Sequence, residues 1–125
     1  MTTTLNTTKL NAISVAELKL AIEGRDAKAL ASFYADDAVL RIIDRDNSPS
    51  KPRELRGKAA IAAYYDDVCG RAMSHRIESG VTDGKQLAFT QACTYTEGGK
   101  VLCITMLDLE EGKIARQTAV QAWDQ

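Results

Sequence analysis

Turn signals divide the second half of the chain into four runs of similar length, and this pattern limits the fold more than any other feature. The runs cover residues 75–82, 86–97, 101–109 and 113–123, and the breaks between them are Asp83-Gly84, Gly98-Gly99 and Glu110-Glu111-Gly112. Glycine beside an acidic residue or a second glycine is typical of the turns that join antiparallel strands. The pattern therefore predicts a four-stranded antiparallel meander.

Helical patterns precede the meander. Ser14 and Glu17 have the spacing of a capping box, in which the serine hydroxyl accepts from an early helix amide and the glutamate reaches back to the cap amide. Apolar residues then repeat every three or four positions as far as Gly24, which we expect to end this first helix in a left-handed conformation. Asp26 can cap a second, short helix that forms a hairpin with the first.

A strand and a loop follow the second helix. Residues 38–44 alternate and are rich in β-branched side chains, which predicts a strand with Ile42 and Asp44 on one face. Residues 45–56 contain both prolines of the chain and show no helical or strand period, so we expect a loop. The apolar repeat over residues 57–70 predicts a third helix.

These elements predict an α+β fold, in which three N-terminal helices pack in a strongly curved, mainly antiparallel sheet. The chain has 125 residues, which is the size of one domain. Residues 1–8 are rich in threonine and have little to bury, so we expect a flexible tail there and a single domain over residues 9–125.

Composition argues against several classes of partner. Sixteen basic and seventeen acidic residues give a net charge of −1, whereas nucleic acid requires a basic surface. We also expect no membrane contact, because no apolar run approaches the roughly twenty residues that cross a bilayer. The first residues lack the segments of a secretory signal, which predicts a cytoplasmic protein.

The three cysteines and the single histidine do not form a recognisable ligand set. Cys69, Cys93 and Cys103 have no C-x-x-C spacing, and their small apolar neighbours place them in the expected core. His75 has no neighbouring cluster of cysteine or carboxylate side chains. We therefore expect no metal, and no cofactor.

The strand expected over residues 101–107 is apolar on both faces. One face carries alternate residues from Val101, and the other carries Leu102, Ile104 and Met106. A strand of an antiparallel sheet usually exposes one face to water. Either another element of the same chain covers the second face, or a second copy does, and we expect a homodimer through Leu102, Ile104 and Met106.

Four short segments occur in a characteristic order along the chain. They are Glu23-Gly24-Arg25-Asp26 with residues 30–37 (LASFYADD), Arg56-Gly57-Lys58 with Ile61 and Tyr64-Tyr65, Thr82-Asp83-Gly84-Lys85, and Glu111-Gly112-Lys113-Ile114. In this order and spacing, residues 14–123 resemble the SnoaL-like branch of the nuclear transport factor 2-like superfamily. The resemblance implies a cone-shaped half-barrel of the cystatin-like type, open at one end to a mostly apolar pocket and commonly dimerised through its sheet.

The family includes ketosteroid isomerases and polyketide cyclases, whose catalytic positions can be compared with this sequence. The isomerase pattern implies a tyrosine where this chain has Leu18, an aspartate at Ile42 and a protonated aspartate at Thr105. The cyclase pattern implies an acid near Ala119. None of these positions carries the family's residue, so the resemblance leaves enzymatic activity open.

Two titratable residues are candidates for acid–base chemistry. Asp44 follows Ile42 on the same predicted face and is a candidate general base; alternatively, it starts the polar loop and points to water or to an arginine. His75 is in phase with Ile77 and Val81, so its imidazole is a candidate acid, base or hydrogen-bond partner. Alternatively, a backbone carbonyl holds His75 at the strand end.

The remaining expected pocket residues are aliphatic, aromatic and amide side chains, with the tyrosines placed on helices. They are Leu18, Tyr34, Ile42, Tyr64, Tyr65, Phe89, Gln91, Thr105, Gln117, Gln121 and Trp123. Core packing is the alternative role for the tyrosines.

Such a pocket suits a small hydrophobic molecule, and three functions are compatible with it. The first is a cofactor-independent isomerase, lyase or cyclase acting on a carbonyl-containing or polycyclic metabolite. The second is a non-catalytic module that binds a small molecule. The third is a protein-interaction module of the same fold.

Overall fold

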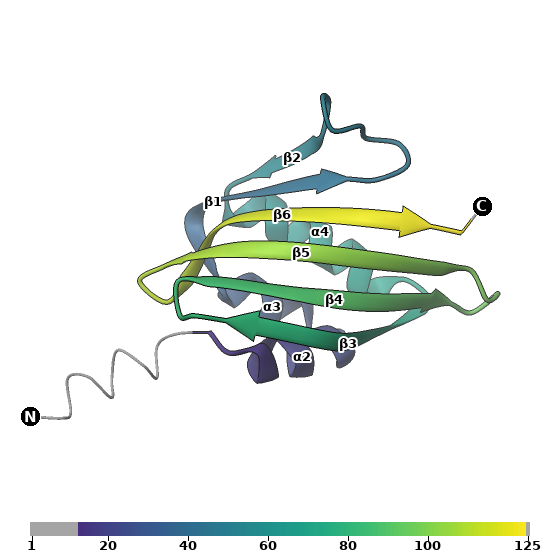
Figure 1. Cartoon of the computed structure of the whole chain (residues 1–125), viewed down its shortest axis with the longest axis horizontal. Coiled ribbons are helices and arrows are strands. Elements are labelled where there is room, and N and C mark those ends of the chain that lie inside the picture. Colours follow the sequence, from purple (N-terminus) through teal and green to yellow (C-terminus); the bar gives the residue numbers. More distant parts are fainter. Residues whose placement is uncertain (1–12, 125) are drawn as a thin grey trace, which may run out of the picture.

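The computed structural model describes residues 13–124 and has an α+β architecture (Figure 1). The helices are α2 (Val15–Glu23), α3 (Ala27–Ser32) and α4 (Lys58–Gly70). The strands are β1 (Tyr34–Ile43), β2 (Arg53–Arg56), β3 (Met73–Thr82), β4 (Gln86–Tyr95), β5 (Lys100–Glu110) and β6 (Lys113–Trp123). The tail expected over residues 1–8 and the domain start expected at residue 9 lie outside the described residues.

The six strands form one sheet in the order β2-β1-β6-β5-β4-β3, and the helices lie against one of its faces (Figure 1). All neighbouring strands are antiparallel except β1 and β6, which are parallel. Register shifts interrupt β1, β3 and the β5–β6 pair. Such irregularities bend a strand and increase its twist, which helps the sheet to curve over the helices. The predicted fold class and the meander are confirmed.

Local signals explain where α2 begins and ends. The Ser14 hydroxyl accepts from the Glu17 amide at 3.1 Å, and the Ser14 amide donates to the Glu17 carboxylate at 3.2 Å, so the predicted capping box forms. The prediction that Gly24 adopts the left-handed conformation is wrong. Gly24 has φ −80°, and the left-handed residue is Arg25, with φ 54°. The amides of Arg25 and Asp26 donate to carbonyls three and five residues earlier. This Schellman pattern requires its left-handed residue at Arg25.

Two strand predictions are corrected near β1. Tyr34, expected on a helix, is the first residue of β1, because the Phe33 carbonyl already accepts from the Ile114 amide of β6 at 2.8 Å. The expected loop over residues 45–56 contains β2, whose Leu55 pairs with Leu40 of β1. This pairing satisfies backbone groups at the sheet edge, although the sequence there has no apolar alternation.

The main core lies between the helices and the inner face of the sheet. Ile61 of α4, Leu40 of β1 and Ile114 of β6 are almost completely buried in it. Its helical side includes Leu18 and Leu30. Because α2 and α3 are short, only a few side chains from each helix reach the sheet.

The outer face of β5 remains exposed, as the alternation predicted. Leu102, Ile104 and Met106 are 43%, 54% and 50% exposed, and Val120 on β6 is 46% exposed. Inward-facing residues such as Leu107 are buried. Within residues 13–124, no helix is long and apolar enough to span a membrane.

Candidate functional site

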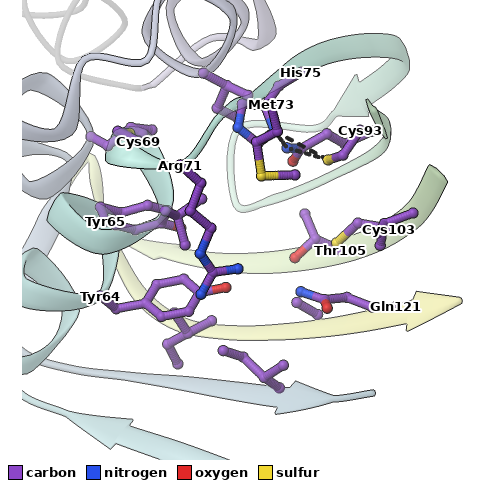
Figure 2. A pocket seen from close by; sticks show the side chains of 18 of the residues that line it. Tyr64, Tyr65, Cys69, Arg71, Met73, His75, Cys93, Cys103, Thr105 and Gln121 are labelled. Atoms are coloured by element: carbon purple, nitrogen blue, oxygen red, sulfur yellow. Dashed lines mark hydrogen bonds between the residues drawn. The ribbon is translucent and has the colours of Figure 1, made fainter. Parts of the chain in front are cut away.

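A cavity of about 90 Å³ lies between α4 and the inner face of the sheet (Figure 2). Side chains from α4 and from strands β1, β3, β4, β5 and β6 line it, with Ile22 of α2 and Leu30 of α3. Most of the residues expected at a pocket contribute to this lining. They are Ile42, Tyr64, Tyr65, Phe89, Gln91, Thr105, Gln117, Gln121 and Trp123.

Two of the expected pocket residues lie elsewhere. Leu18 packs in the main core and does not line the cavity, because it lies on the buried face of α2. Tyr34 lies behind the cavity wall, where its hydroxyl contacts Tyr65 and Gln117. Its position at the start of β1 removes it from the helical lining that the sequence suggested.

A buried hydrogen-bond chain crosses the wall of the cavity. The Tyr65 and Tyr34 hydroxyl oxygens are 2.6 Å apart, and Tyr34 donates to the side-chain carbonyl of Gln117. Gln117 Nε2 donates to the Thr105 hydroxyl at 2.9 Å, and that hydroxyl donates to the Thr118 carbonyl at 3.1 Å. The chain therefore joins α4 to β1, β6 and β5.

The direction of this chain is fixed at the Thr105 end. Because a hydroxyl has a single proton, the bond from Thr105 to Thr118 makes Thr105 an acceptor toward Gln117. Gln117 must then turn its carbonyl toward Tyr34, which donates to it and accepts from Tyr65. The opposite direction would lose the bond to Thr118. Burial raises the pKa of both tyrosines, so both keep their protons.

His75 lines the cavity beside Cys93 and Gln91, as Figure 2 shows for the first two. His75 Nδ1 is 3.1 Å from Cys93 Sγ and 3.1 Å from Gln91 Nε2, which also donates to Cys93 Sγ at 3.3 Å. When Nδ1 accepts from the Gln91 amide, the imidazole proton lies on Nε2. That nitrogen is buried and has no hydrogen-bond partner among the described residues.

The His75–Cys93 pair is neutral. Burial, followed by the positive charges of Arg25 and Arg71, lowers the pKa of His75 from its ordinary value. Burial also raises the pKa of the Cys93 thiol. A thiol and a neutral imidazole are therefore the favoured forms, so Cys93 is not held as a reactive thiolate.

Asp44 does not reach the cavity, so its expected inward position is corrected. Its Oδ1 accepts at 2.9 Å from the Asp46 amide, the Asn47 amide and the Asn47 side-chain amide. The strand ends at Ile43, and the chain turns immediately afterwards. The alternation that put Asp44 on the face of Ile42 does not continue into the turn, where its carboxylate organises the backbone.

Several lining residues were not predicted as pocket residues. Cys69, Cys93 and Cys103 all border the cavity, and burial raises the pKa of Cys103 to about 12. Arg71 and Met73 also line it, at the junction of α4 and β3. Cys93 and Cys103 alternate in phase with the inward-facing residues of β4 and β5, so strand alternation could have predicted that they face the cavity. No sequence signal indicated Arg71.

Aromatic side chains of the cavity lining stack with one another and with arginines. Tyr95 and Trp123 stack with ring centroids 6.0 Å apart. The Arg45 guanidinium lies 4.3 Å from the Trp123 ring centroid, and that of Arg53 lies 5.3 Å from the Tyr64 centroid. Such contacts orient the guanidinium groups against the rings.

The cavity is chemically simple. Neutral amides, phenols, thiols and one imidazole are set among apolar side chains, and Arg71 carries its one fixed charge. Neither aspartate nor glutamate occurs among its described lining residues. Over residues 13–124, histidine, cysteine and carboxylate side chains form no group of three suited to a metal ion.

The sequence of residues 15–117 matches the family model of the SnoaL-like domain. This match covers well over half of the chain, and the chain belongs to the SnoaL-like domain family of the nuclear transport factor 2-like superfamily. The resemblance drawn from the four short segments is thus confirmed. No curated protein matches the sequence at a significant level.

Solved structures share the fold at low sequence identity. A nuclear transport factor 2-like protein of unknown function from Mesorhizobium loti superposes with a TM-score of 0.75 and 12% identity, covering 94% of this chain and 92% of that one. An uncharacterised Silicibacter pomeroyi protein with a cystatin-like fold gives 0.68 and 20%, covering 86% and 72%. SalBIII, an epoxide hydrolase/cyclase-like enzyme of pyran ring formation in salinomycin, gives 0.66 and 19%, covering 94% and 92%. These similarities establish the cystatin-like fold.

Buried His75 makes stability depend on pH. Unfolded histidine binds a proton near pH 6.5, whereas the lowered pKa keeps folded His75 neutral until the pH is lower. Between these two pKa values the unfolded state binds more protons, so stability is full above about pH 6.5 and is lost as pH falls through the folded pKa. We expect wild type to lose more free energy of unfolding than His75→Gln between about pH 7.5 and about pH 5, measured by urea denaturation. Equal losses would contradict this prediction.

Proposed function

We propose that this protein binds a small, mostly apolar molecule in the cavity between α4 and the sheet. The observation that carries the proposal is the composition of the cavity wall, where apolar side chains surround a few converging neutral hydrogen-bonding groups. This composition is typical of small-molecule sites. A protein-interaction module whose pocket is filled by its own side chains fits less well, because about 90 Å³ remain open.

The size of the cavity restricts the ligand. Its volume of about 90 Å³ is well below the roughly 300–1,000 Å³ of drug-sized sites. An engineered apolar cavity of about 150 Å³ binds benzene. The proposal therefore favours short-chain or small cyclic ligands over polycyclic ones, with the flexible Met73 side chain able to adjust the available space.

The polar groups of the wall favour a ligand that contains a carbonyl group. The His75 Nε2 proton lacks an acceptor among the described residues, and a ligand carbonyl oxygen would supply one. Tyr65 gives its proton to Tyr34, so its oxygen can only accept a further hydrogen bond. A ligand that combines an acceptor with a nearby hydroxyl would satisfy both residues.

Acid–base catalysis by His75 is the second candidate function. His75 is the one residue of the described cavity lining whose ordinary pKa lies near neutral pH, and its ring lies beside the expected ligand. Isomerase, lyase or cyclase chemistry on a carbonyl compound would require it to move a proton. Asp44 takes no part in this proposal, because its carboxylate is bound within a turn.

Filling the cavity tests the proposed function. Ala119 is 5% exposed and lines the cavity, so Ala119→Leu should occupy the space and reduce binding of butanone and cyclopentanone at least tenfold. Binding is followed by amide chemical shifts in two-dimensional NMR spectra, which also report whether the variant is folded. Ala122→Leu, on the exposed side of the same strand, is the matched control. Unchanged binding in folded Ala119→Leu would place these ligands elsewhere.

The same ketones separate binding from catalysis. Deuterium exchange beside the carbonyl in heavy water, faster with the protein than without it and lost in His75→Gln, would support the catalytic candidate. Saturable binding without exchange would support binding alone. We propose a cytoplasmic location, in which the three cysteine side chains that border the site would remain thiols.

We also propose that two copies associate through the outer face of the sheet. Ile104 and Val120 are paired neighbours on β5 and β6, and with Leu102 and Met106 they form a continuous exposed apolar face. A two-fold axis through this face would bury the same residues of both copies. The proposal leaves the cavity accessible, because it lies on the opposite side of the sheet.

A charge on this face should prevent association. Ile104→Lys would place an ammonium group in the centre of the apolar contact, so the expected mass in solution falls from two chains to one. Multi-angle light scattering after gel filtration measures it. Leu20→Lys on α2, where the native side chain is 77% exposed, is the control and should retain the dimer. A monomeric wild type would refute the proposal.

A further inference from the structure

Arg71 brings a positive charge to the edge of an otherwise neutral cavity. It follows α4 directly, and Figure 2 shows its side chain extending across the cavity beside Tyr64. Its Nη2 pairs with Asp67 at 2.6 Å, and its Nη1 donates to the Tyr95 hydroxyl at 3.4 Å. A guanidinium has five N–H donors. These two contacts leave further N–H donors of this cavity-lining side chain unused.

A second arginine, Arg25, binds the backbone of the segment that carries Arg71. Arg25 Nη1 donates to the Arg71 carbonyl at 3.2 Å and to the Met73 carbonyl at 2.9 Å. These bonds hold the short connection between α4 and β3 against the turn after α2. They limit the positions that the Arg71 side chain can take, and they place a further positive charge nearby.

Two more arginines lie on the aromatic walls at the same end. Arg45 covers the Trp123 ring, and Arg53 covers the Tyr64 ring. Neither guanidinium forms an ion pair with a carboxylate within residues 13–124. Trp123 and Tyr64 both line the cavity, so these charges add to that of Arg71 around its edge.

The charge around the cavity is therefore unbalanced. No aspartate or glutamate occurs among its described lining residues, and Asp67 pairs with Arg71 from the exposed surface of α4. The pKa of His75 reflects the same imbalance, because the charges of Arg25 and Arg71 lower it further after burial. An apolar cavity with a cationic edge fits a molecule with an apolar body and one anionic end.

We propose that the ligand of this cavity is a small apolar carboxylate, whose carboxylate group binds Arg71 while its hydrocarbon part lies against Ile42 and Phe89. The proposal rests on the proposed binding function and names the chemical class of its ligand. Charge-assisted bonds from a guanidinium to a carboxylate are among the strongest hydrogen bonds in proteins. The apolar part is limited to a short chain or small ring by the cavity volume of about 90 Å³.

Matched pairs of ligands test the charge separately from the cavity. Butyrate and hexanoate are compared with butanol and hexanol by two-dimensional NMR titration of wild type and Arg71→Met. The methionine keeps an unbranched apolar side chain and removes the charge. Arg76→Met is the control. Arg76 lies on β3, five residues after Arg71, but its side chain is 72% exposed and pairs with Glu78.

The carboxylates should bind wild type about tenfold or more tightly than the alcohols, and Arg71→Met should remove this advantage, a change of about 1.4 kcal/mol. Alcohol binding should change less than about twofold in Arg71→Met and neither series should change in Arg76→Met. Alcohols that bind wild type as tightly as carboxylates would overturn the carboxylate proposal and leave the proposed function intact. An equal loss of both series in Arg71→Met would also overturn it. If neither series binds wild type, the proposed function fails as well.

Discussion

The hydrogen-bond chain from Tyr65 to Thr105 is the interaction on which the arrangement of helix and sheet depends. It joins α4 to β1 through Tyr34 and to the β5–β6 hairpin through Gln117, and these three parts of the fold are far apart in the sequence. Each of its polar groups would be costly to bury alone, whereas the completed chain satisfies them together. It therefore sets where α4 lies above the sheet, and with it one wall of the cavity.

The cavity follows from a mismatch between the two layers. A sheet of six strands presents more inward-facing side chains than α2, α3 and α4 can cover. At one end the helices cover the sheet with residues such as Leu18 and Ile61. At the other, Met73, Tyr95 and Trp123 surround the space that remains. A mostly apolar environment there strengthens each polar contact that a ligand would make with His75 or Arg71.

Turn chemistry and capping made most of the fold predictable. The glycine-containing breaks located the four strands of the meander to within a few residues, and Ser14 with Glu17 marked the start of α2. β2 could not be predicted, because three of its four residues are charged and exposed, and the segment owes its conformation to pairing with β1. Pairing with the neighbouring strand, rather than local propensity, determines whether such an edge segment becomes a strand.

The site was predictable where strand period continued and was missed where the chain turned. Thr105 and Gln117 were placed correctly by alternation, whereas Asp44 lies just past the end of β1, where alternation no longer applies. Arg71 lies between a helix and a strand, so neither period assigns it a direction. Its contribution depends on tertiary contacts with Tyr95 and Arg25, which no local pattern encodes.

The most direct measurement compares the free energies of unfolding of Tyr34→Phe, Tyr65→Phe and the double variant. In the assigned direction, Tyr34→Phe leaves the Gln117 carbonyl and the Tyr65 proton without partners, which predicts a loss of about 2–3 kcal/mol. Tyr65→Phe removes one donor and should cost about 1 kcal/mol, with the double variant losing less than the sum. Tyr65→Phe costing as much as Tyr34→Phe, with additive effects, would contradict the directed chain.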